Sequence, residues 1–215
     1  MATATYVQEG SAIDYTPAAD VSAGDVVVQN ELVGVARLNI KADVLGALPP
    51  ALAKLGHKVC VISPLYRGVR QKAEEIGLPL QRVPHGSFSV PIGDAEVPCV
   101  TWESRLPDSD VRVCFLQNDR YYDRAGYYTN PVDHTDFQDN SERFIFLSRG
   151  ALEMCIATGL RPDIIHSHDW HTGLVPIYVE YIYRDEFPDT ATVFTIHNLA
   201  YQGIFWHWDM KLAGL

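Results

Sequence analysis

The 215-residue chain lacks the features that mark several large classes of protein. It contains no run of about 18 apolar residues, which argues against a transmembrane helix. Its first residues form neither a basic nor an apolar leader region, so no signal peptide is predicted. Basic residues are scarce, with 17 Lys and Arg against 27 Asp and Glu and a formal net charge of −10. This balance argues against binding to nucleic acid or to an anionic membrane through bulk electrostatics.

Several cofactor and catalytic motifs are also missing. No G-x-G-x-x-G or Walker sequence occurs, which argues against a dinucleotide-binding site and against a P-loop phosphate site. No G-x-S-x-G sequence occurs, which argues against a hydrolase triad. There is no C-x-x-C pair, and the cysteines stand singly in apolar runs. They are therefore predicted to be reduced core thiols of a cytoplasmic protein rather than disulfide partners: Cys60, Cys99, Cys114 and Cys155.

From residue 43 onward, helical and strand patterns alternate. Helices are predicted over 43–55, 140–158 and 173–183, and strands over 57–64, 111–116, 164–166 and 192–196. Two alternating runs, 87–92 and 95–102, flank Gly93 and Asp94, which predicts a hairpin that forms an antiparallel edge. The alternation predicts an α/β fold with a doubly wound, Rossmann-like parallel sheet.

Residues 1–41 follow a different pattern. Short β-like runs at 6–10, 11–15, 25–28 and 32–36 are separated by Gly, Asp and Ala, without any helical period. This predicts a small β-rich segment of foreign character before an α/β domain that covers residues 42–215.

Two polar segments, 166–173 and 195–203, each follow an apolar, β-branched run. Polar groups at the carboxyl ends of buried strands are where open α/β sheets bind ligands. We therefore expect Asp169 and His197 to lie at neighbouring strand ends and to line one cleft. A zinc site built from the histidines and Asp169 is the weaker alternative, because a strand-to-helix turn points these side chains in several directions. No metal or other cofactor is predicted.

The remaining side chains of these segments suit a sugar. Aromatic rings cover the apolar face of a pyranose, and carboxylate, imidazole and amide groups hold its hydroxyls. Trp170, Tyr201 and Phe205 could supply rings, and five polar residues could hold hydroxyls: Asp169, His171, His197, Asn198 and Gln202. The alternative is structural, with Trp170 and Tyr201 as core aromatics and His171 as a turn cap.

Residues 42–215 resemble the N-terminal half of bacterial glycogen synthases and plant starch synthases, the retaining glucosyltransferases that use ADP-glucose. The matching segments occur in family order: 42–49, 56–59, 64–66, 122–126, 139–144, 166–173 and 194–203. The resemblance implies a GT-B architecture of two Rossmann-like domains, with an α-1,4-glucan acceptor and ADP-glucose meeting between them. It also implies a cytoplasmic enzyme, or a plastid enzyme if the parent is a plant protein.

The resemblance also implies roles for individual residues. Asp169 matches the family aspartate beside the donor glucose, and His197 matches the histidine near the reaction centre, so both are predicted to be catalytic. The residues predicted to bind substrate are Tyr128, Trp170, His171, Asn198, Tyr201 and Gln202. In the family, a Lys-Thr-Gly-Gly loop approaches the donor phosphates. Here Arg37 stands where the lysine belongs and the bulkier residues 38–40 replace Thr-Gly-Gly, so Arg37 is the candidate for the donor phosphate.

Two further expectations follow from the resemblance. The sequence given stops inside the family's first domain, so we expect transfer of glucose to need a second, nucleotide-binding domain and this chain alone to be inactive. Residues 1–41 resemble the start of phage capsid decoration (cement) proteins, which suggests a chimera. The alternative function is a non-catalytic module, either a glucan-holding domain or a structural, capsid-decoration-like segment.

Overall fold

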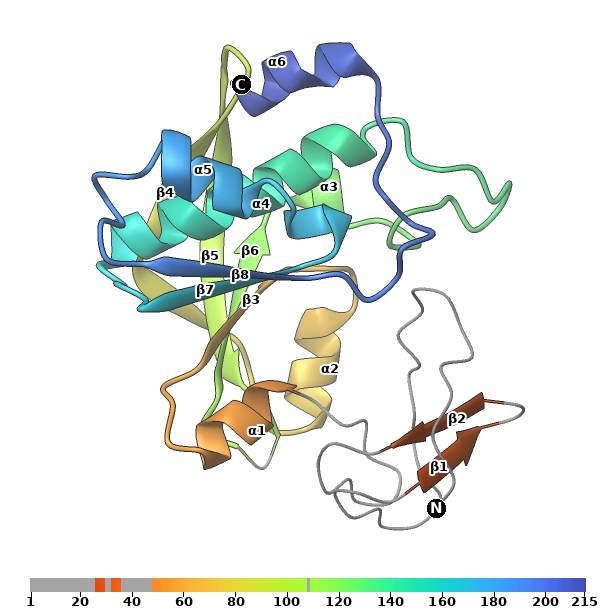
Figure 1. Ribbon diagram of the computed structural model, residues 1–215, viewed down its shortest axis with the longest axis vertical. Helices are drawn as coiled ribbons and strands as arrows, with labels where there is room; N and C mark the ends of the chain where they lie inside the picture. Colours follow the sequence, from red (N-terminus) through yellow and green to blue (C-terminus); the bar gives the residue numbers. More distant parts are fainter. Residues whose placement is uncertain (1–25, 30–31, 36–47, 108) are drawn as a thin grey trace. The chain divides into compact units, whose positions relative to one another are not determined.

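The computed structural model describes residues 26–29, 32–35, 48–107 and 109–215. The chain divides into two compact units (Figure 1). Unit 1 comprises Met1–Val59 with His197–Tyr201, and unit 2 comprises Cys60–Ile196 with Gln202–Leu215. Among the described residues, no helix is long and apolar enough to span a membrane.

Unit 1 holds a two-stranded hairpin and one short helix among its described residues. Strands β1 (Val26–Gln29) and β2 (Leu32–Val35) pair antiparallel, which agrees with the β-like runs read from the sequence there. Helix α1 (Leu48–Lys54) is followed by Gly56, which has a φ of +92° that suits glycine after a helix end. The earlier part of the predicted helix, the β-like runs before residue 25 and Arg37 lie outside the described residues.

A four-stranded mixed sheet forms the centre of unit 2, in the order β3-β6-β5-β4. Strands β3 (Cys60–Pro64) and β6 (Arg112–Gln117) are parallel, as expected of an α/β fold. Strands β4 (Gln81–Ile92) and β5 (Ala95–Arg105) form the predicted hairpin, with Gly93 at a φ of +56° in its turn. The hairpin is longer than predicted, and β4 lies at the sheet edge as expected.

Helix α4 (Asn140–Thr158) packs across this sheet and confirms the longest predicted helix. It ends where Gly159 adopts a φ of +71°, again as expected. Gly150 lets the helix approach the sheet closely, since a Cβ there would lie 3.2 Å from Leu116 Cδ1. Two short helices, α2 (Val69–Glu75) and α3 (Asp119–Tyr122), were not predicted. The core between helix and sheet includes Val90, Leu116, Phe146, Leu152 and Met154.

A second, parallel pair of strands in unit 2 carries the polar turn of interest. β7 (Ile164–His168) and β8 (Ala191–Thr195) pair in register from Ile164 opposite Ala191 to His168 opposite Thr195. The connection between them contains the 3₁₀ turn η1 (Trp170–Thr172) and helix α5 (Val175–Tyr181). This confirms the predicted strand–helix–strand unit. The 3₁₀ turn η2 (His207–Asp209) and helix α6 (Met210–Ala213) follow near the end of the chain.

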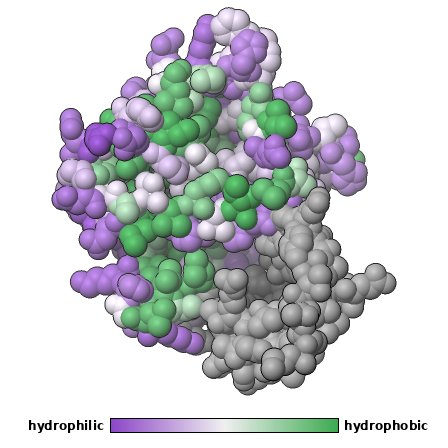
Figure 2. All heavy atoms as spheres, in the orientation of Figure 1, coloured by the Kyte–Doolittle hydropathy of each residue, from purple (hydrophilic) through white to green (hydrophobic). Residues whose placement is uncertain are grey.

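The outer strand β8 presents apolar side chains to the surface. Val193 and Phe194 are 42% and 43% exposed, and Ile164 of β7 is 61% exposed. Hydrophobic residues are visible on the face of the molecule along which β8 runs (Figure 2). A parallel strand is usually buried on both faces, so this side of the strand pair is more open than its sequence alone would predict.

Candidate functional site

The backbone at Asp169 adopts a conformation that few residues other than glycine tolerate. Asp169 follows the last residue of β7 and has a φ of +54° with a ψ of −177°. Its N–H donates to the Thr195 carbonyl at the end of β8, at 2.9 Å. Such strained residues concentrate at functional sites, and they persist only where the surrounding structure enforces them. The parallel strand pair therefore fixes the backbone from which the Asp169 carboxylate projects.

The turn after Asp169 is closed by the hydroxyl of Thr172. This hydroxyl accepts a hydrogen bond from the His168 N–H at 2.6 Å and donates to the His168 carbonyl at 2.8 Å. The Thr172 N–H in turn donates to the Asp169 carbonyl at 3.2 Å. On the strand itself, His166 Nε2 lies 2.7 Å from the Thr195 hydroxyl, which ties the two strands together again. The turn is thus held by side-chain hydrogen bonds as well as by the backbone hydrogen bonds between β7 and β8.

Aromatic rings surround the turn that Asp169 begins. The Trp170 ring lies 4.8 Å from Phe144, edge to face, 5.3 Å from Phe205 and 6.3 Å from Tyr128, measured between ring centroids. The His171 ring lies 4.8 Å from both Tyr128 and Phe144. Trp170 and His171 are partly buried, whereas Tyr128 and Phe205 are 44% and 42% exposed. We call this group, Tyr128, Phe144, Trp170, His171 and Phe205, the aromatic cluster.

The charge of Asp169 affects the pKa values of two residues of the aromatic cluster. Burial lowers the pKa of His171 to about 4, and the nearby Asp169 carboxylate only partly opposes this. Burial also raises the pKa of Tyr128, and Asp169 adds to that increase. His171 is therefore a neutral imidazole at neutral pH, with a buried Nε2 that has no hydrogen-bond partner among the described residues. Such an atom can accept or donate one further hydrogen bond, depending on its tautomer.

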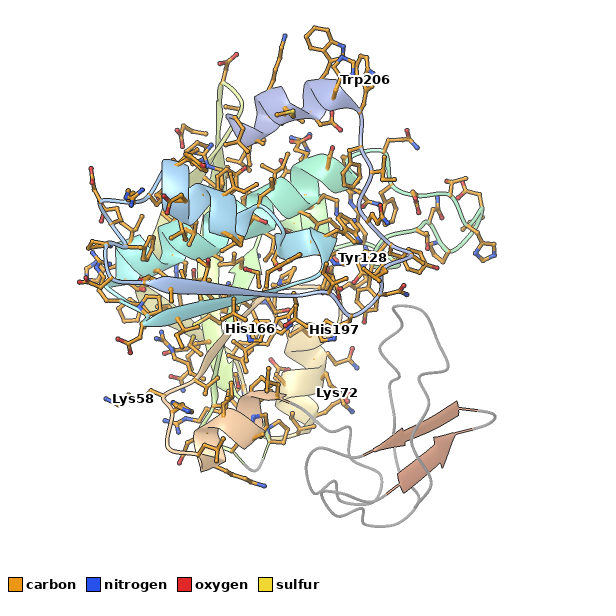
Figure 3. All side chains as sticks on the ribbon, in the orientation of Figure 1. Lys58, Lys72, Tyr128, His166, His197 and Trp206 are labelled. Carbon is orange, nitrogen blue, oxygen red and sulfur yellow. The ribbon has the colours of Figure 1, made fainter. Side chains whose placement is uncertain are left out.

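A network at the start of α4 holds the loop that carries Tyr128. The Asn140 side-chain amide donates to the Tyr128 carbonyl at 2.9 Å, and Asn140 Oδ1 accepts from Arg143 Nη1 at 2.6 Å. Arg143 is fully buried and also donates to the Tyr121 carbonyl at 2.8 Å. Arg124 pairs with Asp139 through both carboxylate oxygens, at 2.7 and 2.5 Å. The backbone at Tyr128 (labelled in Figure 3) is thus held by Asn140, which Arg143 holds in turn.

Gly203 allows the last aromatic segment to pack against Trp170. A Cβ at this position would lie 2.7 Å from three Trp170 side-chain atoms, and its φ is +61°. Only glycine satisfies both the contact and the backbone angle without strain. Gly203 therefore brings the preceding residue, Gln202, and the following residues up to Phe205 beside the turn.

Three predicted site residues belong to unit 1 and are described separately. His197 follows β8 by two residues, and Asn198 caps its own turn, because its Oδ1 accepts from the Ala200 N–H at 2.9 Å. Tyr201 is 70% exposed, so the interpretation of this side chain as a core aromatic is wrong. The common cleft of Asp169 and His197 remains a prediction. Arg37 lies outside the described residues.

The structure also bears on the weaker metal interpretation. Among residues 48–107 and 109–215, no group of three or more His, Cys, Asp or Glu side chains is placed to hold a metal ion. His166 and His168 stack on each other at 4.2 Å between ring centroids, with an interplanar angle of 27°.

Sequence reasoning missed several residues of the site. Phe144 packs on both Trp170 and His171, yet it lies 26 residues before Trp170 in the sequence. Asn140 and Arg143 lie in the family segment 139–144, and no local sequence pattern links them to Tyr128. The available signal was polar residues within an otherwise apolar helix, since Asn140 and Arg143 are buried on α4.

Comparison with known proteins gives two family matches. The starch synthase catalytic domain family matches residues 31–215, and the phage cement protein family matches residues 7–49. Glycogen synthase 1 of Geobacter sulfurreducens is 42% identical over 193 residues, and glycogen synthase of Thermotoga maritima is 38% identical over 192 residues. Each match covers 88% of this chain. The chain spans only 37–38% of the length of these curated relatives.

A solved structure shows the same relationship. The catalytic domain of starch synthase IV from Arabidopsis thaliana, bound to ADP and acarbose, superposes with a TM-score of 0.65 at 26% identity. The match covers 78% of this chain and 32% of that one. It confirms the predicted α/β class and the relation to the GT-B starch synthases. Because the family match covers most of its length, the chain belongs to the starch synthase catalytic domain family.

Proposed function

We propose that this chain is the glucan-binding part of an ADP-glucose-dependent glucan synthase. The reaction is the transfer of glucose from ADP-glucose to the 4-hydroxyl of an α-1,4-glucan, with retention of configuration. The observation that carries the proposal is the aromatic cluster packed around Asp169 at the carboxyl end of β7. The names of the relatives and the ADP and acarbose bound to the Arabidopsis structure support it.

The residues of the cluster suit the acceptor side of this chemistry. Exposed faces of Tyr128 and Phe205 can cover the apolar faces of glucose units, while the neutral His171 can hydrogen-bond to a hydroxyl. Asp169 orients a hydroxyl and places negative charge near the positive charge that develops at the sugar carbon. No direct attack by Asp169 on the sugar is required.

Transfer also needs positive charge around the leaving diphosphate. Arg143, the buried cation beside the cluster, is engaged with Tyr121 and Asn140. We therefore propose that a second domain supplies the groups that bind the diphosphate, as the larger size of the relatives suggests. Arg37 is the candidate within this chain for a contact to the donor phosphate.

Two assays test the proposed function. Isothermal titration with maltoheptaose measures glucan binding by the chain itself, and Asp169→Ala and Trp170→Ala should weaken it. Incorporation of radiolabelled glucose from ADP-glucose into glycogen should be absent for the chain alone. It should appear when the part of a glycogen synthase that follows the matched region, with its second domain, is fused after Leu215, and Asp169→Ala should abolish it. Turnover by the chain alone would contradict the two-domain requirement, and an active fusion insensitive to Asp169→Ala would contradict the site.

We also propose that Asp169 and His197 act in the same transfer reaction. The support is that β7 and β8 are neighbouring parallel strands and that His197 follows β8 by two residues. In the active fusion, Asp169→Ala and His197→Ala should each lower kcat. The fold decrease in kcat of the double variant should be smaller than the product of the two single fold decreases. If the fold decreases in kcat simply multiply, the two residues act independently and the proposal is contradicted.

A non-catalytic glucan-binding role is the second candidate, because the aromatic cluster lies within unit 2 alone. Binding of maltoheptaose together with a fusion that never transfers glucose would favour this role.

We further infer that residues 1–41 have a separate origin from the rest of the chain. The phage cement match over residues 7–49 supports this inference, although the two family matches overlap between residues 31 and 49. Sequencing single transcripts across the codons for residues 31–49 in the source organism tests it. A continuous transcript would indicate a natural fusion, and its absence would indicate an assembly of two sequences.

A further inference from the structure

Tyr127 is more exposed than its neighbour Tyr128. Tyr127 is 59% exposed and Tyr128 44% exposed, and both lie in the loop between α3 and α4. A tyrosine that is mainly structural in a loop would be expected to bury more of its ring. More than half of this residue is therefore open to solvent.

Tyr127 is nevertheless held in a defined orientation. Its ring meets Tyr66 edge to face, with 4.8 Å between centroids and an interplanar angle of 74°. Tyr66 is partly buried and packs in the same manner on the fully buried Tyr122, at 5.6 Å. The base of the loop is fixed by Arg67, which donates to the side chain and the carbonyl of Asp123 at 2.7 Å each. Little conformational entropy is therefore left to lose when a ligand covers the ring.

Tyr127 also continues the aromatic cluster. Its centroid lies 6.3 Å from that of Tyr128, which in turn lies 6.3 Å from Trp170, and Trp170 lies 5.3 Å from Phe205. Trp170 directly follows Asp169 in the sequence, and the Asp169 charge raises the pKa of Tyr128, so these two rings mark the part of the row beside the carboxylate. Tyr127 is one ring further along the row.

On this geometry, and resting on the proposed function, we propose that Tyr127 forms an additional glucose-binding subsite for longer glucans. A short oligosaccharide would occupy the positions at Tyr128 and Trp170. A longer chain would extend past them, and one further glucose unit would stack on the Tyr127 ring. The ligand is a polymer of identical units, so each added contact raises the affinity only for chains long enough to reach it.

The test compares maltotriose with maltoheptaose by isothermal titration on the 215-residue chain and on Tyr127→Ala. We expect Tyr127→Ala to lower the affinity for maltoheptaose about three- to tenfold, which is the range of a single aromatic contact. The affinity for maltotriose should stay within about twofold of the wild-type value. Tyr127→Phe keeps the ring and should retain wild-type affinity for both sugars. Tyr181→Ala is the matched control, because it removes a 78% exposed tyrosine on α5 and should change neither affinity.

The outcomes separate the subsite from the proposed function. One outcome is that the wild type binds both sugars while Tyr127→Ala lowers the affinity for both equally or for neither. In that case the subsite is overturned and the glucan site stands. If the wild type binds neither sugar, the proposed function fails and the subsite with it. Circular dichroism of Tyr127→Ala must match the wild type, and if it does not, Tyr127→Leu replaces it and is held to the same criteria. A second exposed aromatic, Trp206 at the top of Figure 3, gives a further control on another part of the surface.

Discussion

Lowering the pH from 7 to below 4 should charge His171 inside the aromatic cluster and destabilise the fold. Burial lowers the pKa of His171 from 6.5 to about 4, so the unfolded chain binds a proton more readily than the folded one. The stability contributed by the neutral imidazole is therefore complete above pH 6.5 and is lost progressively as the pH falls towards 4. The shift corresponds to about 3 kcal/mol as an upper value, because the ring is partly exposed and water screens its charge.

The assay is urea unfolding of the wild type and of His171→Gln between pH 4 and 7.5. Other groups titrate in both proteins, and the carboxyl of Asp139 is one of them. Burial acts to raise the pKa of Asp139, but Arg124 outweighs it and holds the pKa below its usual value. The difference in free energy between the two proteins therefore isolates His171, and it should shrink by up to about 3 kcal/mol as the pH falls to 4. A difference that does not change with pH would refute the reasoning, as would an NMR titration of His171 near its usual pKa.

Three further perturbations test the packing around the turn. Gly203→Ala should destabilise the protein by roughly 2–4 kcal/mol in urea unfolding, because its Cβ would lie 2.7 Å from Trp170 at a positive φ; a change below about 1 kcal/mol would contradict this. Asp169→Gly should be more stable than Asp169→Ala by about 1–2 kcal/mol in the same assay, since only glycine relieves the strained backbone, and the reverse order would disprove strain. Asn140→Ala should cost roughly 2–3 kcal/mol of stability and weaken maltoheptaose binding through Tyr128, whereas unchanged affinity would show that the loop keeps its position without this bond.

Local patterns were sufficient to predict most of the described elements. The period of apolar residues in 140–158 and the following Gly159 predicted α4 within a residue, because helix periodicity and a glycine end are short-range properties. The alternating runs around Gly93 and Asp94 predicted the β4–β5 hairpin for the same reason. The boundaries moved where tertiary pairing extended a strand, as in β4, which begins at Gln81 rather than at Ser87.

The sequence also pointed to the turn after β7 as a site, because charged and aromatic residues interrupt an apolar strand there. It could not place the partners of that turn. Phe144 and Tyr128 reach Trp170 and His171 only when α4 packs across the sheet and its network orients the loop before it. Contacts between residues far apart in sequence depend on packing, which no local pattern encodes.

By itself, therefore, the sequence determined the α/β class and the order of the strands and of the helices other than α2 and α3, and it predicted a sugar site in the segment around Asp169. Local propensity, side-chain period and turn chemistry are enough for those conclusions. Only the tertiary structure decided that the backbone at Asp169 is strained, that His171 is held neutral by burial, and that Gly203 must lack a side chain against Trp170. Strain, desolvation and close contact arise from atoms that meet only after the chain has folded.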